Sequence, residues 1–80
     1  MLIFDGFQSK AKAYDFQNEV NARYKKIARV CATQEEANKI DPFPYHLAGT
    51  IVLVERDDNS SVELAIQALA SKHGGNFAGT

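Results

Sequence analysis

The order of apolar and polar residues changes several times along the chain, and each change predicts a new element. Residues 2–4, LIF, form a short apolar run followed by Asp5 and Gly6, which is typical of a buried strand and its exit. From Ser9 onward, apolar residues recur every three to four positions, as on one face of a helix. These residues are Ala13, Phe16, Val20 and Tyr24. We expect a helix from Lys10 to Tyr24 with Ser9 as its N-cap.

Residues 25–33, KKIARVCAT, fit two interpretations. Nothing breaks the helix before Thr33, so the helix could continue. However, β-branched residues become frequent and the helical stripe is not kept, which favours a strand over about Ile27 to Ala32. Residues 33–36, TQEE, then match a capping box, in which the Thr hydroxyl and the last Glu satisfy main-chain N–H groups. A short helix, Gln34 to Lys39, should follow.

The second half begins with the loop DPFP, residues 41–44, which must end the short helix because a residue before proline leaves the helical region. TIVLV, residues 50–54, is apolar at every position, so we expect a central strand buried on both faces. SSVE, residues 60–63, matches a second capping box and starts a helix that reaches His73. Gly74 is suited to end this helix in a left-handed conformation. The tail NFAGT predicts a short edge strand anchored by Phe77.

The expected order is therefore β-α-β-(short α)-β-α-β, the split βαβ or ferredoxin-like arrangement. We expect one α+β domain over residues 1–80, with an antiparallel sheet and two helices on one face. Right-handed crossovers place the first and third predicted strands in the middle of the sheet. These two segments are also the most apolar of the chain.

Composition limits the chemistry that this domain can carry. Hydrophobic residues make up 45% and charged residues 24%, as in an ordinary globular domain. One cysteine and two histidines lie far apart, so neither a disulfide nor a zinc site is expected. No phosphate-binding glycine motif occurs, and we expect no cofactor. No apolar run is long enough for a membrane span and the N-terminus lacks the pattern of a signal peptide, so we expect a cytoplasmic protein.

Charge is unevenly distributed, although the net charge is only −1. Residues 1–31 carry six basic and three acidic side chains, and residues 32–80 carry three basic and seven acidic ones. Such asymmetry can mark a nucleic-acid-binding face, but in so small a domain it is more typical of a solvated surface. RNA-recognition domains of this fold stack bases on aromatics of both central strands. Only the first predicted strand has aromatic residues near it, Phe4 and Phe7, so nucleic acid is not the expected partner.

Few residues suggest a site. His46 could act as a general base or ligand, but no nucleophile or carboxylate pair stands at a recognisable spacing from it. Cys31, alone in a predicted strand, is more typical of a small buried hydrophobe than of a nucleophile. Phe43 and Tyr45 are held stiffly by the neighbouring prolines. They could form a recognition patch with His46, or fold back as a lid over the helices. We therefore predict no catalytic or metal-binding residue.

Three stretches carry a resemblance to a known group of proteins: the DPFP loop, the apolar strand that ends in VER, and the tail GGNFAGT. In these features most of the chain resembles a family of small uncharacterised proteins encoded by phages and prophages. The resemblance brings no catalytic residue. It implies a non-enzymatic role, such as binding and inhibiting a host protein.

Two functions from different classes remain open. The first is a small protein-interaction module without chemistry of its own, and we favour it. The second is a small-molecule-binding or enzymatic domain like the dimeric α+β barrels. Because two helices cover only one sheet face, aliphatic residues of the central strands should remain on the other face and be covered by a second copy. We therefore expect a homodimer through the open sheet face, with Val52 and Val54 among the candidate partner-binding residues.

Overall fold

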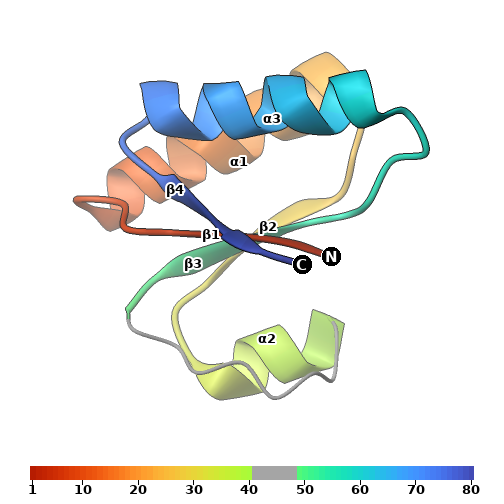
Figure 1. The fold of residues 1–80 in the computed structure, drawn as a ribbon. Coiled ribbons are helices and arrows are strands. Elements are labelled where there is room, and N and C mark those ends of the chain that lie inside the picture. Colours follow the sequence, from red (N-terminus) through yellow and green to blue (C-terminus); the bar gives the residue numbers. More distant parts are fainter. Residues whose placement is uncertain (41–48) are drawn as a thin grey trace.

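The computed structural model describes residues 1–40 and 49–80. Its elements, in chain order, are β1 (Leu2–Asp5), α1 (Lys10–Tyr24), β2 (Ala28–Cys31), α2 (Gln34–Ile40), β3 (Ile51–Val54), α3 (Ser60–Lys72) and β4 (Asn76–Gly79). The four strands form one antiparallel sheet in the order β2-β3-β1-β4 (Figure 1). This is the predicted ferredoxin-like topology, with the first and third strands in the middle.

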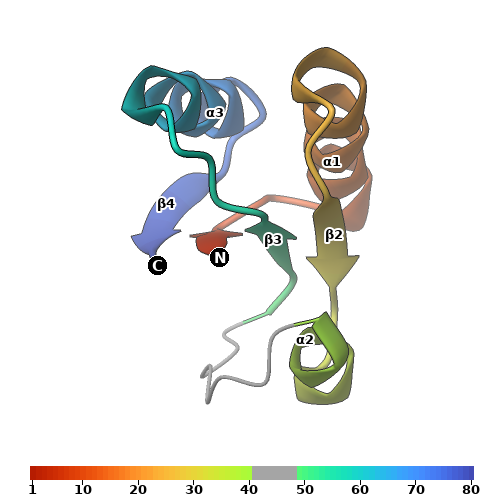
Figure 2. The same cartoon turned by 90° about the vertical axis from the view of Figure 1, so that its right-hand side faces the viewer.

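The helices lie on both faces of the sheet. The two long helices α1 and α3 cover one face, as expected, and α2 lies against the other (Figures 1 and 2). On this second face, Cys31, Ile51 and Leu53 are buried together with Ala37 of α2, and Ile40 packs against them. We expected this sheet face to be open, with Val52 and Val54 among the residues that a partner covers. The short helix instead buries Cys31, Ile51 and Leu53 within a single copy of the chain.

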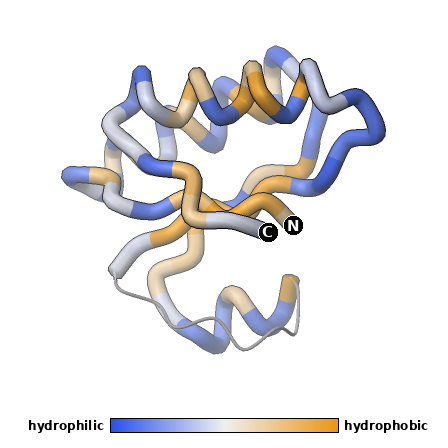
Figure 3. The backbone as a smooth tube through the Cα atoms, viewed as in Figure 1, coloured by the Kyte–Doolittle hydropathy of each residue, from blue (hydrophilic) through white to orange (hydrophobic). Residues whose placement is uncertain are grey.

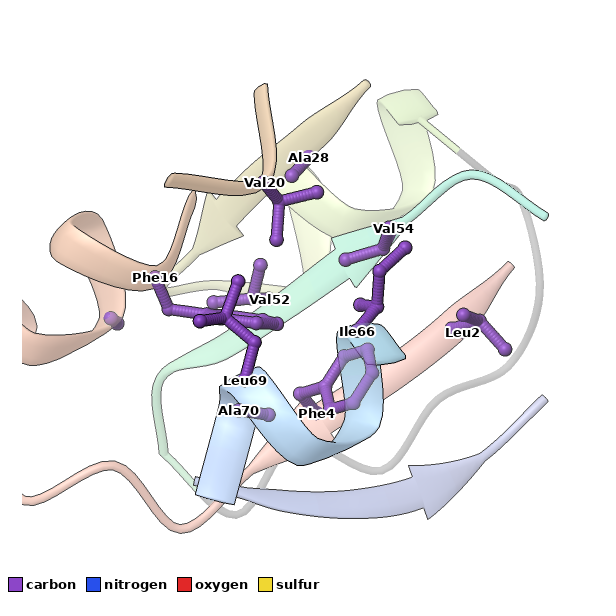
Figure 4. Packing of buried hydrophobic residues seen from close by; sticks show 11 residues of the cluster. Leu2, Phe4, Phe16, Val20, Ala28, Val52, Val54, Ile66, Leu69 and Ala70 are labelled. Carbon is purple, nitrogen blue, oxygen red and sulfur yellow. The ribbon is translucent and has the colours of Figure 1, made fainter. Parts of the chain in front are cut away.

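Side-chain alternation divides the sheet between two cores. Leu2, Phe4, Val52 and Val54 face α1 and α3 and pack with residues such as Phe16 and Ile66 (Figure 4). The intervening residues of β3 enter the smaller core beneath α2. All four residues of β3 are buried, which confirms the prediction from TIVLV. Figure 3 shows the hydropathy along the chain, with apolar residues in the central strands of the sheet and alternating polar and apolar positions on the helices.

The predicted boundaries of α1 are confirmed at both ends. The Lys12 N–H donates to the Ser9 hydroxyl at 3.2 Å, so Ser9 is the N-cap. The helix ends at Tyr24, and Lys25 takes a left-handed conformation with φ 53°. That turn directs the chain into β2, which is one residue shorter at each end than predicted. The stretch after Tyr24 is therefore a strand and not an extension of the helix.

The two capping boxes differ in outcome. The Glu36 N–H donates to the Thr33 hydroxyl at 3.2 Å, as predicted for α2. For α3 the prediction is one residue too late, because the N-cap is Asn59 and its side chain accepts the Ser61 N–H at 2.9 Å. An amide oxygen caps a helix as well as a hydroxyl does, so the two residue types compete for this position.

The end of α3 follows the prediction made for Gly74. This residue has φ 81°, and its N–H donates to the Ser71 carbonyl at 3.0 Å. The N–H of Gly75 donates to the Ala70 carbonyl at 2.8 Å, which completes a Schellman motif. Gly75 is buried, and a Cβ atom at this position would overlap the ring of Phe7. The close approach fixes the point at which the chain enters β4.

Candidate functional site

The sequence candidates fall into three groups in the structure. Phe43, Tyr45 and His46, with the rest of the DPFP loop, lie outside the described residues. Val52 and Val54 are fully buried between the sheet and the long helices, so they belong to the core and offer no surface to a partner. Cys31 is also fully buried, on the opposite sheet face. The partner-binding role predicted for the two valines is therefore corrected, because their side chains point beneath α1 and α3.

Cys31 has the properties of a structural residue. Its thiol is free, and burial raises the pKa of that thiol, with a further contribution from the negative charge of Glu36. A raised pKa reduces the fraction of thiolate, which is the nucleophilic form. This environment matches the prediction that Cys31 packs as a small hydrophobe.

The aromatic residues near β1 face the helices. Phe4 is fully buried and its ring meets that of Phe16 edge to face, with centroids 5.1 Å apart. Phe7 stacks on the same Phe16 ring at 5.6 Å. RNA-recognition domains need such rings on the sheet face that nucleic acid can reach. In this chain the rings of Phe4 and Phe7 instead form part of the helix-side core.

His73 joins the two long helices. Its Nε2 lies 3.0 Å from Oε1 of Glu19 on α1, and its ring packs 6.1 Å from that of Phe16. The hydrogen bond from His73 is the main reason why the pKa of Glu19 lies below its ordinary value. Arg23 lies one helical turn away, 3.5 Å from the other carboxylate oxygen. The His73–Glu19 pair thus has a structural role: it fastens the end of α3 to the middle of α1.

A second set of charged groups fastens the loops at one end of the sheet. Lys26 pairs with Asp57 at 2.8 Å, and Arg56 pairs with Glu63 at 2.8 Å. Glu63 also accepts the main-chain N–H of Asp57 at 2.9 Å. These contacts tie the start of β2 and the end of β3 to the first turn of α3. Within residues 1–40 and 49–80, no three His, Cys, Asp or Glu side chains are grouped so that they could hold a metal ion.

The β2 edge of the sheet is closed by side chains. Main-chain N–H groups at alternate residues of an edge strand point away from the sheet. At this edge three such groups have side-chain acceptors: Ala28 donates to Asn21 at 2.9 Å, Val30 to Gln17 at 2.9 Å, and Ala32 to Glu36 at 2.8 Å. The first two acceptors come from α1 and the third from α2, which lie on either side of β2 (Figure 2). We call β2 with these three acceptors the closed edge.

The β4 edge differs from the closed edge. Among the side chains of residues 1–40 and 49–80, none is hydrogen-bonded to the main chain of β4. The strand carries no charge, and its first three residues are exposed. The ring of Phe77 packs against Phe4 at 5.5 Å, yet 40% of Phe77 remains accessible. We call β4 the open edge.

The pairing of the strands shows which way the main chain of Phe77 points. The N–H of Val30 is directed outward to Gln17, so Val30 and its partner Val52 do not exchange ladder bonds, and Val52 points toward β1. Phe4 is opposite Val52 and points back toward β3. Phe77 is opposite Phe4, so its N–H and C=O point away from β1. The open edge therefore presents a donor and an acceptor on the same residue that holds the exposed ring.

Sequence reasoning did not identify the residues that distinguish the edges. Gln17 and Asn21 stand four apart on α1, each directly after a buried residue, Phe16 and Val20. Residues with this spacing share one side of a helix. A polar pair beside the apolar stripe was therefore a usable signal for contact with a strand edge. The strand that they meet could be assigned only from the fold.

Comparisons with protein-family models, with curated proteins and with solved structures find no match to this chain. No helix in the described part of the chain is long and apolar enough to cross a membrane. The geometry of the two edges is therefore the feature of this chain that bears on its function.

Proposed function

We propose that the protein is a small non-enzymatic protein-interaction module, and that the open edge is its binding element. The observation that carries the proposal is the contrast between the two edges. A strand edge with unpaired N–H and C=O groups is a template for another extended chain, and proteins that use no edge for binding usually protect it. Here three side chains protect β2, and none of the described side chains protects β4.

The proposed mode of binding is addition of a strand to the sheet. In this mode, main-chain hydrogen bonds provide much of the affinity, and side chains that alternate along the added strand provide specificity. Phe77 supplies both parts, because its main chain points outward and its half-exposed ring can pack on an apolar side chain of the partner. The structural roles of Cys31 and of the His73–Glu19 pair support a function without covalent chemistry.

The proposal is compatible with the role that the resemblance to phage- and prophage-encoded proteins implies. A module that adds its edge strand to a host protein would inhibit that protein by occupying the edge that its normal partner uses. We place the module in the cytoplasm, because a single free thiol such as Cys31 is stable in a reducing compartment.

The test compares two alanine-to-lysine variants that add the same charge at exposed positions. Ala78→Lys places a lysine on the open edge, where it opposes strand pairing. Ala68→Lys places it on α3, away from the edge.

Native-host extract is passed over immobilised wild type and both variants, and each retained protein is purified and mixed with the module. We expect a retained protein that binds wild type and the α3 variant, loses affinity for the edge variant by about tenfold or more, and protects the Phe77 amide from hydrogen exchange. Equal binding to all three forms would reject the open edge as the binding element.

A further inference from the structure

We infer that, when no host protein is bound, the open edge accepts β4 of a second copy of this chain. The two β4 strands would run antiparallel across a two-fold axis and join two four-stranded sheets into one. The inference rests on the proposed function, because it names the occupant of the same edge. It also moves the expected homodimer contact from the sheet face, where α2 packs, to the sheet edge.

The main chain of Phe77 is suited to pair with itself. In an antiparallel ladder, two directly opposite residues whose groups face one another exchange both N–H···O bonds. Phe77 presents its N–H and C=O to the outside. When a two-fold axis passes between two copies of Phe77, the donor of each copy meets the acceptor of the other, which is the self-complementarity that a two-fold interface requires.

The side chains of the open edge favour the same arrangement. β4 carries no charged residue, so two copies bring no like charges together. The Phe77 ring packs against Phe4 at 5.5 Å, and 40% of Phe77 remains accessible. Opposite residues of paired strands project to the same face, so the ring of the second copy would lie beside this ring and extend the aromatic cluster across the axis. The closed edge offers the opposite conditions, with its outward N–H groups already bonded and the charged Arg29 exposed.

The size of the strand determines how tight the dimer is. β4 has four residues, and its register with β1 shifts between Ile3 and Phe4, so regular pairing beyond Phe77 is short. Contacts of this size fall among weak and transient interfaces. We therefore expect a dimer whose population depends on concentration, with a dissociation constant in the range of tens to hundreds of micromolar, roughly.

Sedimentation equilibrium of the purified protein, from about 10 μM to about 1 mM, tests the inference over the range in which a weak interface dissociates. We expect wild type and Ala68→Lys to show the same monomer–dimer equilibrium. Ala78→Lys should raise the dissociation constant at least tenfold. Thermal unfolding of the three proteins checks that each is folded. A variant is compared with wild type only if it unfolds in a cooperative transition. If Ala78→Lys does not fold cooperatively, Ala78→Glu takes its place.

A second measurement locates the interface directly. Amide exchange of wild type at the two ends of the concentration range should show slower exchange for Phe77 in the dimer and unchanged exchange for Val30, whose N–H is already bonded to Gln17. A wild-type protein that is monomeric throughout overturns the inference. A dimer that Ala78→Lys leaves intact also overturns it, because the contact then lies elsewhere. In either case the proposed function is decided separately, by whether a host protein distinguishes the edge variant from the α3 variant.

Discussion

The two edges of the sheet belong to the same fold but meet their surroundings differently. At the closed edge, α1 and α2 supply three side-chain acceptors to the outward N–H groups of β2. At the open edge, β4 lies below α3 and receives no such bond from the described side chains. An N–H group has to be paired with protein or with water. Within the described residues, side chains therefore pair the outward N–H groups at one edge, and solvent or a partner is left to pair those at the other.

The cause of the difference lies in the polar residues beside each helix's buried stripe. On α1, Gln17 and Asn21 flank the stripe on the side that faces β2. On α3, Glu63 bonds instead to Arg56 and to the main-chain N–H of Asp57, and no described side chain of this helix bonds to β4. The difference between the edges therefore depends on the side chains that the neighbouring helices carry, and on α2, which lies beside β2 and supplies the third acceptor.

The largest expected effect comes from opening the closed edge. Gln17→Leu combined with Asn21→Leu removes two acceptors and leaves two partly buried N–H groups unpaired. Each orphaned donor costs roughly 1–3 kcal/mol, so we expect the free energy of unfolding to fall by about 2–6 kcal/mol in urea titrations. Amide exchange at Ala28 and Val30 should also accelerate.

Asn18→Leu is the matched control, since Asn18 lies on the exposed side of the same helix and bonds only to the side chain of Gln17 among the described residues. It should cost much less than the double variant. If the double variant is as stable as this control, water replaces both acceptors without loss, and the distinction between the edges has no energetic basis.

A smaller effect is expected where the chain enters the open edge. Gly75→Ala forces a Cβ atom into the ring of Phe7, and overpacking of this kind costs about 1–3 kcal/mol. Thermal unfolding should show the loss. In a Phe7→Leu background the ring is absent, so the added cost of Gly75→Ala should shrink. An unchanged cost in both backgrounds would show that the strain has another origin.

Much of this fold could be predicted from the sequence, because local signals agreed with the tertiary arrangement. The apolar spacing from Ala13 to Val20 and the Ser9 cap gave both ends of α1, and the unbroken apolar run gave β3. The N-cap of α3 was misplaced by one residue because Asn59 and Ser60 are both good capping residues. Local pattern alone cannot decide between such neighbours.

The candidate site was less accessible to sequence reasoning. The bond from Val30 to Gln17 joins residues thirteen apart on different elements, so it exists only once the helix is packed on the sheet. The role of α2 was missed for a similar reason. Its apolar residues Ala37 and Ile40 are too few to predict that this helix of seven residues packs on a sheet face.

A smaller loss of stability, about 1 kcal/mol, is expected from a substitution of Cys31, which is buried on the inner side of the closed edge. Cys31→Ala removes a buried sulfur atom and should reduce the free energy of unfolding by roughly that amount, the typical cost of a point substitution. In the native protein, the raised pKa and the burial of the thiol should make alkylation by iodoacetamide at neutral pH much slower than in urea. Equally fast modification in both conditions would mean that β2 and α2 separate readily, and that the closed edge is not held shut.

The smallest effect concerns the ion pairs at the start of the closed edge, and it depends on pH. Lys26, through its hydrogen bond, lowers the pKa of Asp57 below its ordinary value of 3.8, and Arg56 lowers that of Glu63 below 4.5. A carboxyl group with a lower pKa in the folded state contributes stability above its ordinary pKa and loses it as the pH falls through the folded-state value.

We therefore expect the thermal midpoint to decrease as the pH is lowered below about 4.5. It should decrease less in Asp57→Asn, which has already lost one of these groups. Because these groups remain partly accessible to solvent, the difference should be small and should shrink in high salt. Asp15→Asn removes an exposed carboxylate from α1 and is the control for the loss of one negative charge. If Asp57→Asn keeps the wild-type pH dependence, the pair with Lys26 contributes nothing measurable, and the closed edge is held by its side-chain acceptors and by packing alone.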